Sequence, residues 1–215
     1  MDFTVWDIVR NLLLASRWTA LLSLAAFVNG GIAGLIILQL RIAKSPWLNR
    51  PARIYIALFQ GTPLLMQLFL VFFGLPLLGI QVEAWTAAMI GLTLCASAFL
   101  AEIWRSGVEA VPKGQWEAGR SLGLQYIQLM RHVILPQAFR IIQAPTVGFL
   151  VQMIKSTAVT SIIGFGELMR AANAINNATF EPFLVYGVGA LIYFGLCFPL
   201  TRYSKYLEGR RAVHS

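Results

Sequence analysis

The sequence has 215 residues, of which 58% are hydrophobic and only 12% are charged. Because about a quarter of the residues in a soluble domain are charged, this composition excludes an ordinary soluble protein, and it equally excludes a disordered chain. The formal net charge of +8 would suggest a nucleic-acid partner in a soluble protein, but membrane proteins gather Lys and Arg in their cytoplasmic loops, so we expect no nucleic-acid partner and a chain that lies in lipid.

Five charge-free stretches predict membrane-spanning helices, each of which needs about 20 apolar residues. The second stretch, residues 54–82, is longer than one crossing and rich in glycine and proline, so we expect a helix to about residue 74 and then an outer loop. The fourth is weaker, because Lys155 interrupts it. The sequence thus predicts an all-α integral membrane protein, a single domain over residues 1–215, with spans at about residues 18–40, 54–74, 84–102, 138–155 and 182–201.

The basic residues predict how these spans are oriented. With five spans the termini lie on opposite sides, and thirteen of the seventeen Lys and Arg residues fall in one set of loops. Since cytoplasmic loops carry the excess of positive charge, we expect the N-terminus outside and the C-terminus in the cytoplasm. The thirteen are Arg41, Lys44, Arg50, Arg53, Arg105, Lys113, Arg120, Arg131, Arg140, Arg202, Lys205, Arg210 and Arg211.

The longest cytoplasmic stretch, residues 105–137, is expected to be structured. A turn at residues 112–115 precedes apolar residues that are spaced as in short amphipathic helices, and Pro136 is expected to close the element. Composition alone leaves two interpretations open: a docking surface for another protein, or a helix that lies on the lipid headgroups.

Residues suited to catalysis are few. No Gly-Lys dipeptide occurs, which excludes a Walker-type phosphate-binding loop, and two histidines are too few for a His-rich metal site. No Gly-x-Ser-x-Gly elbow occurs either. We therefore predict no catalytic residue and no metal site, and a transporter component fits better than an enzyme.

A spaced motif in the cytoplasmic stretch resembles the Glu-Ala-Ala, Gly, Ile-x-Leu-Pro loop of the permease subunits of ATP-binding cassette importers. Segments 59–65, 111–116 and 155–168 resemble the polar amino acid branch of that family. The resemblance covers about residues 18–205 and implies a five-helix type I importer subunit. The residues that match the motif are Glu117, Ala118, Gly119, Gly123, Val133, Leu135 and Pro136.

The resemblance implies that this loop is a coupling helix seated in a groove of a cytoplasmic ATPase. Its small residues would let the two backbones approach closely, and Glu117 would cap the start of the helix, where the helix dipole favours a negative charge. The implied ATPase-coupling residues are Glu117, Ala118, Gly119, Gly123, Leu135 and Pro136.

The resemblance also implies the partners. Two ATPase copies would bind ATP and Mg, while this chain would hold no cofactor. A second permease subunit, identical or paralogous, would complete the pathway, and an external binding protein would deliver a small polar amino acid. The implied location is the bacterial inner membrane.

The fourth span is the best place to seek the substrate path. An ionisable residue at membrane depth is costly, so Lys155 should face a cavity or a partner, unless it reaches to the outer interface. Glu102 either pairs with Arg105 or contacts substrate, and Gln67 either lines the path or makes a polar helix contact. The candidate pathway residues are Lys155, Ser156, Thr157, Thr160, Gln67 and Glu102.

Glycines in the first span predict close helix packing rather than a transport role. They are Gly30, Gly31 and Gly34.

Two functions remain in competition. One is the permease subunit of an ATP-driven importer, and the other is a stand-alone transporter or channel driven by an ion gradient. Proteins of the second kind often have two internal repeats and a buried carboxylate near the midplane. The sequence indicates neither, because five spans have no obvious halving and no Asp follows Asp7.

Overall fold

The computed structural model describes residues 4–43 and 45–212, and these residues form helices and short connections without strands. Lys44, predicted to lie in a cytoplasmic loop, falls outside the described residues. Four helical stretches among the described residues are long and apolar enough to cross a membrane, and the number is five if one bent pair of helices is counted as a span. The prediction of an all-α membrane protein with about five spans is confirmed. The four are α1 (Val5–Ile42), α5 (Ala84–Glu109), the continuous stretch Tyr126–Ile163, and α10 (Pro182–Ala212).

Helices α1 and α5 pack closely against each other. A Cβ atom added to Gly30 would lie 2.4 Å from the Cβ of Ala96, and one added to Gly34 would lie 3.1 Å from the Ser97 carbonyl oxygen. Small residues allow such close approach, which compensates for the absence of a hydrophobic driving force between helices in lipid. The predicted packing role is thus confirmed for Gly30 and Gly34, whereas a Cβ on Gly31 would have its nearest neighbour at 3.6 Å.

The second span is broken, so the prediction of one helix over residues 54–74 was wrong. Helix α2 (Pro46–Gly61) and the stretch Leu64–Leu77, which holds α3 (Leu64–Phe69), the π-helical turn η1 (Leu70–Gly74) and α4 (Leu75–Leu77), meet at 108°. Pro63 at the bend cannot continue the hydrogen-bond ladder. The Gln67 side chain supplies hydrogen bonds in its place: its Nε2 donates to the carbonyl oxygens of Phe59 at 2.9 Å and Thr62 at 3.1 Å.

The fourth span begins earlier than predicted. Helix α7 (Tyr126–Leu129) continues through the π-helical turn η2 (Met130–Ile134) into α8 (Leu135–Ser156) and then the 3₁₀ segment η3 (Thr157–Ile163). Pro136 therefore lies in the first turn of α8 and does not close an element. A proline clashes with the carbonyl of the preceding helical turn, and the wider π turn lies directly before it.

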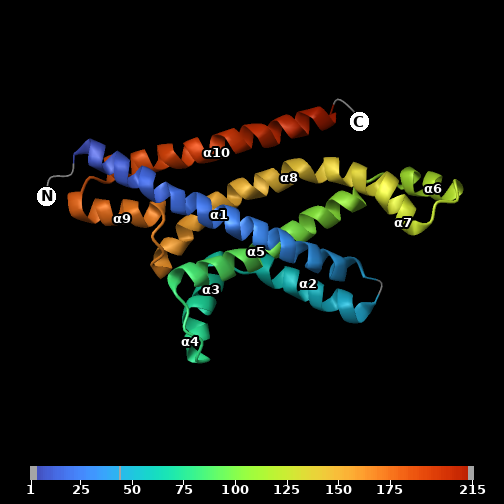
Figure 1. Cartoon of the computed structure of the whole chain (residues 1–215), viewed down its shortest axis with the longest axis horizontal. Helices are drawn as coiled ribbons and strands as arrows, with labels where there is room; N and C mark the ends of the chain where they lie inside the picture. The colour runs from blue at the N-terminus through green and yellow to red at the C-terminus, as the bar shows by residue number, and fades with distance from the viewer. Residues whose placement is uncertain (1–3, 44, 213–215) are drawn as a thin grey trace.

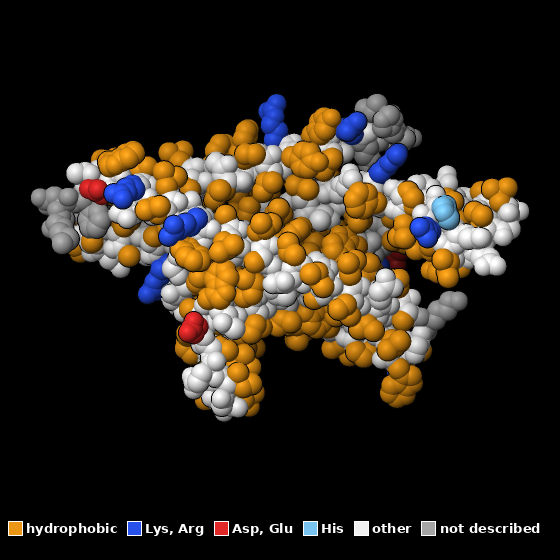
Figure 2. Space-filling model, viewed as in Figure 1, with side chains coloured by type: hydrophobic (Ala, Val, Ile, Leu, Met, Phe, Trp, Pro, Cys, Tyr) orange, Lys and Arg blue, Asp and Glu red, His pale blue; other side chains and the backbone are white. Residues whose placement is uncertain are grey.

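The two ends of the bundle carry different small helices. Figure 1 places the N-terminus and α9 (Leu168–Thr179) at one end of the long axis, and α6 (Lys113–Ser121), α7 and the C-terminus at the other. Hydrophobic side chains cover much of the face shown in Figure 2, and few charged ones interrupt them. An apolar surface between two ends that carry the small helices agrees with a protein that crosses lipid along its long axis.

Candidate functional site

The predicted coupling loop is a helical hairpin, formed by α6 and the start of the α7–α8 helix. After α6 the chain turns at Gly123, whose φ of +73° favours glycine. The amide of Leu124 donates to the Gly119 carbonyl at 3.1 Å and that of Gly123 to the Arg120 carbonyl at 2.9 Å, which is a Schellman ending. The hairpin is thus held by its own backbone.

One of the small residues predicted for the coupling loop packs inside the hairpin. Gly119 is buried and faces the hairpin interior, where an added Cβ would lie 2.2 Å from Cδ1 of the fully packed Leu129. Its smallness therefore lets α6 and α7 close on each other. Ala118 is exposed.

The expected cap at Glu117 is wrong. Helix α6 starts at Lys113 after Pro112, so Glu117 is its fifth residue and lies beyond the turn where the dipole attracts a negative charge. The Glu117 side chain is exposed on the hairpin surface. Its carboxylate can contact a partner but does not cap the helix.

The hairpin tip exposes large apolar side chains. Leu122 is 80% exposed and Ile127 is 77% exposed, and Tyr126 lies beside Ile127 in the chain. The polar residues around them, such as Arg120 and Gln125, are exposed too. Apolar side chains on such a projection mark a surface that another molecule covers.

The candidate pathway residues do not form one cavity. Lys155 is exposed near the end of α8, and no carboxylate among the described residues lies within ion-pair distance of it. Thr157 and Thr160 are fully buried, and their hydroxyls donate to carbonyls of their own helix, Ile154 at 2.7 Å and Thr157 at 2.6 Å. Ser156 is half-buried between them and Lys155.

Glu102 and Gln67 have structural partners. Arg105 forms ion pairs with Glu102 and Glu109, so the predicted pair with Glu102 is confirmed. The Oε2 atom of Glu102 is buried without a partner among the described residues.

Gln67 makes the polar contact at the bend of the second span, which was one of its two expected roles.

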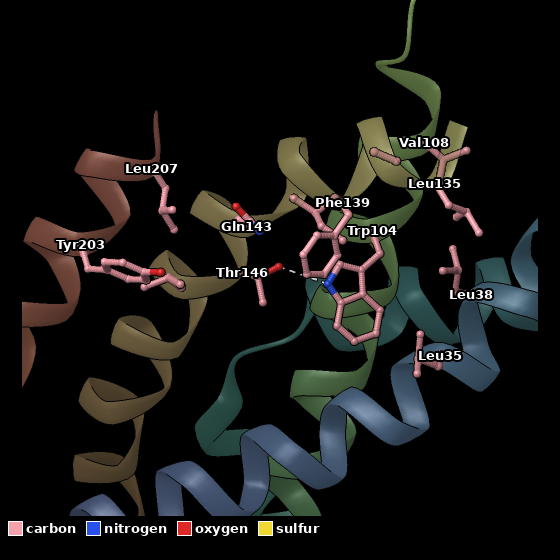
Figure 3. A pocket seen from close by; sticks show the side chains of 13 residues that line it. Leu35, Leu38, Trp104, Val108, Leu135, Phe139, Gln143, Thr146, Tyr203 and Leu207 are labelled. Atoms are coloured by element: carbon pink, nitrogen blue, oxygen red, sulfur yellow. Dashed lines mark hydrogen bonds between the residues drawn. The ribbon is translucent and has the colours of Figure 1, made fainter. Parts of the chain in front are cut away.

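An apolar cavity of about 650 Å³ opens between α1, α5, α8 and α10 (Figure 3). Trp104 points into it and donates from Nε1 to the Thr146 hydroxyl at 3.1 Å. Leu135, which was predicted as a coupling residue of the cytoplasmic loop, lines this cavity, and none of the candidate pathway residues does.

Glu167 is the buried carboxylate that sequence reasoning missed. It is completely buried, and its Oε2 accepts hydrogen bonds from the hydroxyls of Thr19 at 3.3 Å and Tyr193 at 2.9 Å. Its Oε1 accepts from the backbone amide of Arg170 at 2.8 Å, which caps α9. The Gly164-Phe165-Gly166 turn before it, with glycine at a φ of +92°, was a signal that the chain changes direction here.

Burial raises the pKa of Glu167, and the hydrogen bonds from the backbone of Met169 and Arg170, from Tyr193 and from Thr19 offset part of this rise. None of the ion pairs among the described residues includes Glu167. A carboxylate held in this way is costly when it is ionised, and its hydrogen bonds join α1, α9 and α10.

We predict that Glu167 makes stability depend on pH. Because its pKa in the folded protein lies above 4.5, the folded state binds the proton more tightly than the unfolded chain. Its favourable contribution is complete at a pH below that value and is lost as the pH rises through the folded-state pKa. The melting temperature of Glu167→Gln in detergent should therefore shift upward relative to that of the wild type between pH 4.5 and neutrality. Melting curves that stay parallel over this range would contradict the prediction.

Comparison with known proteins places the chain among transport proteins. The family described as "Binding-protein-dependent transport system inner membrane component" matches residues 26–213. The probable amino-acid ABC transporter permease protein YckA of Bacillus subtilis is 40% identical, over 96% of each chain. The arginine transport system permease protein ArtQ of the same organism is 38% identical, over 84% of this chain and 83% of its own length.

A solved structure agrees with these relatives. It is described as an amino acid ABC transporter with histidines, and it superposes with a TM-score of 0.91 and 34% identity, over 98% of this chain and all of that chain. These similarities support an ATP-driven importer over a transporter driven by an ion gradient. The buried carboxylate Glu167 does not favour the second kind, because it lies beyond the end of the fourth span at Ile163. The chain belongs to the binding-protein-dependent inner membrane components, as an integral membrane permease subunit of an ATP-binding cassette importer for amino acids.

Proposed function

We propose that this chain and a second permease, either an identical copy or a paralogue, form the path of a small polar amino acid. Two cytoplasmic ATPases bind ATP and Mg and dock on the hairpin of α6 and α7, while this chain itself binds no cofactor. An external binding protein delivers the solute at the end of the bundle that holds α9. The N-terminus is outside and the C-terminus is in the cytoplasm, as the distribution of Lys and Arg favours.

The observation that carries this proposal is the hairpin itself. Its interior is closed by Gly119 against Leu129, so it moves as one body, and its tip exposes Leu122 and Ile127. In Figure 1 it projects beyond α5 along the long axis of the bundle. A projection in this direction extends away from the bilayer, which favours a protein partner over lipid headgroups as the molecule that covers the tip.

Lys155 is proposed to face the solute path at the boundary with the second permease. Its side chain is exposed and has no carboxylate partner among the residues that the structure describes. An exposed ammonium group at membrane depth is costly unless water or a partner surrounds it. Ser156 beside it is the nearest half-buried hydroxyl on the same segment, and Thr157 and Thr160 lie deeper.

Uptake into proteoliposomes tests the function. The permease is reconstituted with its ATPase and binding protein, ATP is supplied to the ATPase side, and a panel of radiolabelled amino acids is offered. We expect uptake of a polar amino acid that requires ATP and the binding protein and that persists when ionophores collapse the membrane potential. Uptake that stops with the potential while ATP is present would refute the proposal.

A further inference from the structure

Glu167 lies where four helical elements meet. Its carboxylate accepts hydrogen bonds from Thr19 of α1, from Tyr193 of α10 and from the first turn of α9. The Thr19 hydroxyl also accepts from the Leu168 amide at 3.1 Å. The fourth element, η3, is joined to this network through Arg170: its backbone amide donates to Glu167, and its guanidinium donates to the Ser161 carbonyl at 3.3 Å.

The network separates two apolar clusters. The outer apolar cluster joins α9 to the first turns of α1 and α10, and the central apolar cluster lies deeper in the bundle. Glu167 stands in the chain between Phe165 of the central cluster and Leu168 of the outer one, and Thr19 stands between Leu12 and Leu22 in the same way. The outer cluster consists of Ile8, Leu12, Leu168, Ala172, Ile175 and Val185.

The Glu167 network holds the two apolar clusters at fixed positions relative to each other more firmly than apolar contact alone would. Apolar contacts are non-directional, whereas a hydrogen bond constrains both the distance and the angle between its two groups. A buried carboxylate that loses a hydrogen bond leaves an unsatisfied group, which is expensive. A movement of the outer helices is therefore expected to move η3 with them.

The two sides of the layer have different surroundings. On the outer side, α9 buries Leu168, Ala172 and Ile175 and exposes Arg170 and Asn177. On the inner side, η3 holds the fully buried Thr157 and Thr160. Only Ser156 separates η3 from Lys155. The network is thus the polar connection between the outer end of the bundle and the end of the fourth span.

We infer that Glu167 is a positioning residue that couples the outer helices to the 3₁₀ segment Thr157–Ile163, so that engagement of the external binding protein at the outer end shifts that segment. This inference rests on the proposed function, which supplies the binding protein. Glu167 itself touches no solute, because its carboxylate is enclosed by Thr19, Tyr193 and the start of α9.

The test measures how far the binding protein stimulates the ATPase of the reconstituted complex. Tyr193→Phe and Thr19→Val each remove one hydroxyl from the carboxylate, and Glu167→Gln removes its charge. We expect each to lower the ratio of stimulated to basal ATPase rate by roughly fivefold or more, the range of an allosteric coupling, with the basal rate unchanged. The effects of Tyr193→Phe and Glu167→Gln should not add, because both residues act in one network.

Tyr186→Phe is the matched control. It also removes a tyrosine hydroxyl of α10 that bonds to α9, since the Tyr186 hydroxyl donates to Asn173 Oδ1 at 3.0 Å, but it lies outside the Glu167 network. Its ratio should equal that of the wild type.

Two results would overturn the inference. One is an unchanged ratio in Tyr193→Phe and Thr19→Val. The other is a parallel fall of basal rate, stimulated rate and melting temperature, which a purely structural role produces. If Glu167→Gln fails to fold, the two hydroxyl variants decide. A wild-type complex that the binding protein does not stimulate would instead refute the proposed function, so the two failures are distinguishable.

Discussion

Gly30→Ala is expected to destabilise the folded permease by about 1–3 kcal/mol, the usual cost of overpacking. The new methyl group would lie 2.4 Å from the Ala96 Cβ and 3.3 Å from the backbone of α5. Neither neighbour is the end of a flexible side chain, so α1 and α5 must move apart. Thermal unfolding in detergent and the yield of folded protein measure the effect.

Gly31→Ala is the control, because it makes the same chemical change one residue further along α1. The nearest atom to its new methyl group is on Trp104 at 3.6 Å, an ordinary contact. A helix interior gains up to about 1 kcal/mol from Gly to Ala, so this variant should match or exceed the wild type. Equal melting temperatures for the two variants would show that the close α1–α5 approach does not limit stability.

Gly119→Leu is expected to abolish ATP-dependent uptake while the membrane-spanning bundle still folds. Already the Cβ of the new side chain would lie 2.2 Å from Cδ1 of Leu129, which is 1% exposed and has little room to rotate. The hairpin must open, which displaces Leu122 and Ile127 from their places at the tip. Each 1.4 kcal/mol of such a cost would lower the ratio of closed to open hairpin about tenfold.

Gly114→Leu provides the comparison for this second change. It places the same side chain on the same helix, α6, where an added Cβ meets no atom within 4 Å. Proteoliposome uptake and co-purification of the ATPase should be near wild type in Gly114→Leu and lost in Gly119→Leu. Uptake retained in both variants would contradict a role for hairpin closure.

The coupling motif shows how far sequence reasoning reaches. The spacing of Glu117, Gly123 and Pro136 was enough to indicate the family and to locate the hairpin. Of the three, Gly123 meets a local backbone requirement, because the turn after α6 needs a positive φ there. The direction in which each side chain points was not predicted. Gly119 faces inward because Leu129, ten residues later, folds back over it, and Glu117 lies past the helix start because α6 begins at Lys113.

The second and fourth spans show the limit of charge-free windows. Hydropathy located both stretches, since burial in lipid requires apolar residues whatever their path. It did not reveal the 108° bend after Gly61 or the helix that continues through Pro136. Both features depend on how the chain accommodates a proline that cannot donate a hydrogen bond. At the bend the Gln67 amide bonds the Phe59 carbonyl, and before Pro136 the helix widens into a π turn.

The sequence by itself determined the membrane environment, the approximate spans and the transporter family, because composition, periodicity and motif spacing are properties of the chain in one dimension. Only the tertiary structure decided the place of Glu167. Its partner Thr19 is 148 positions away, and nothing near Glu167 in the sequence distinguishes a buried carboxylate from a solvated one. Burial and hydrogen bonding are set by segments that meet in space, so the residue that connects the outer helices to the fourth span became visible only when α1, α9 and α10 were packed together.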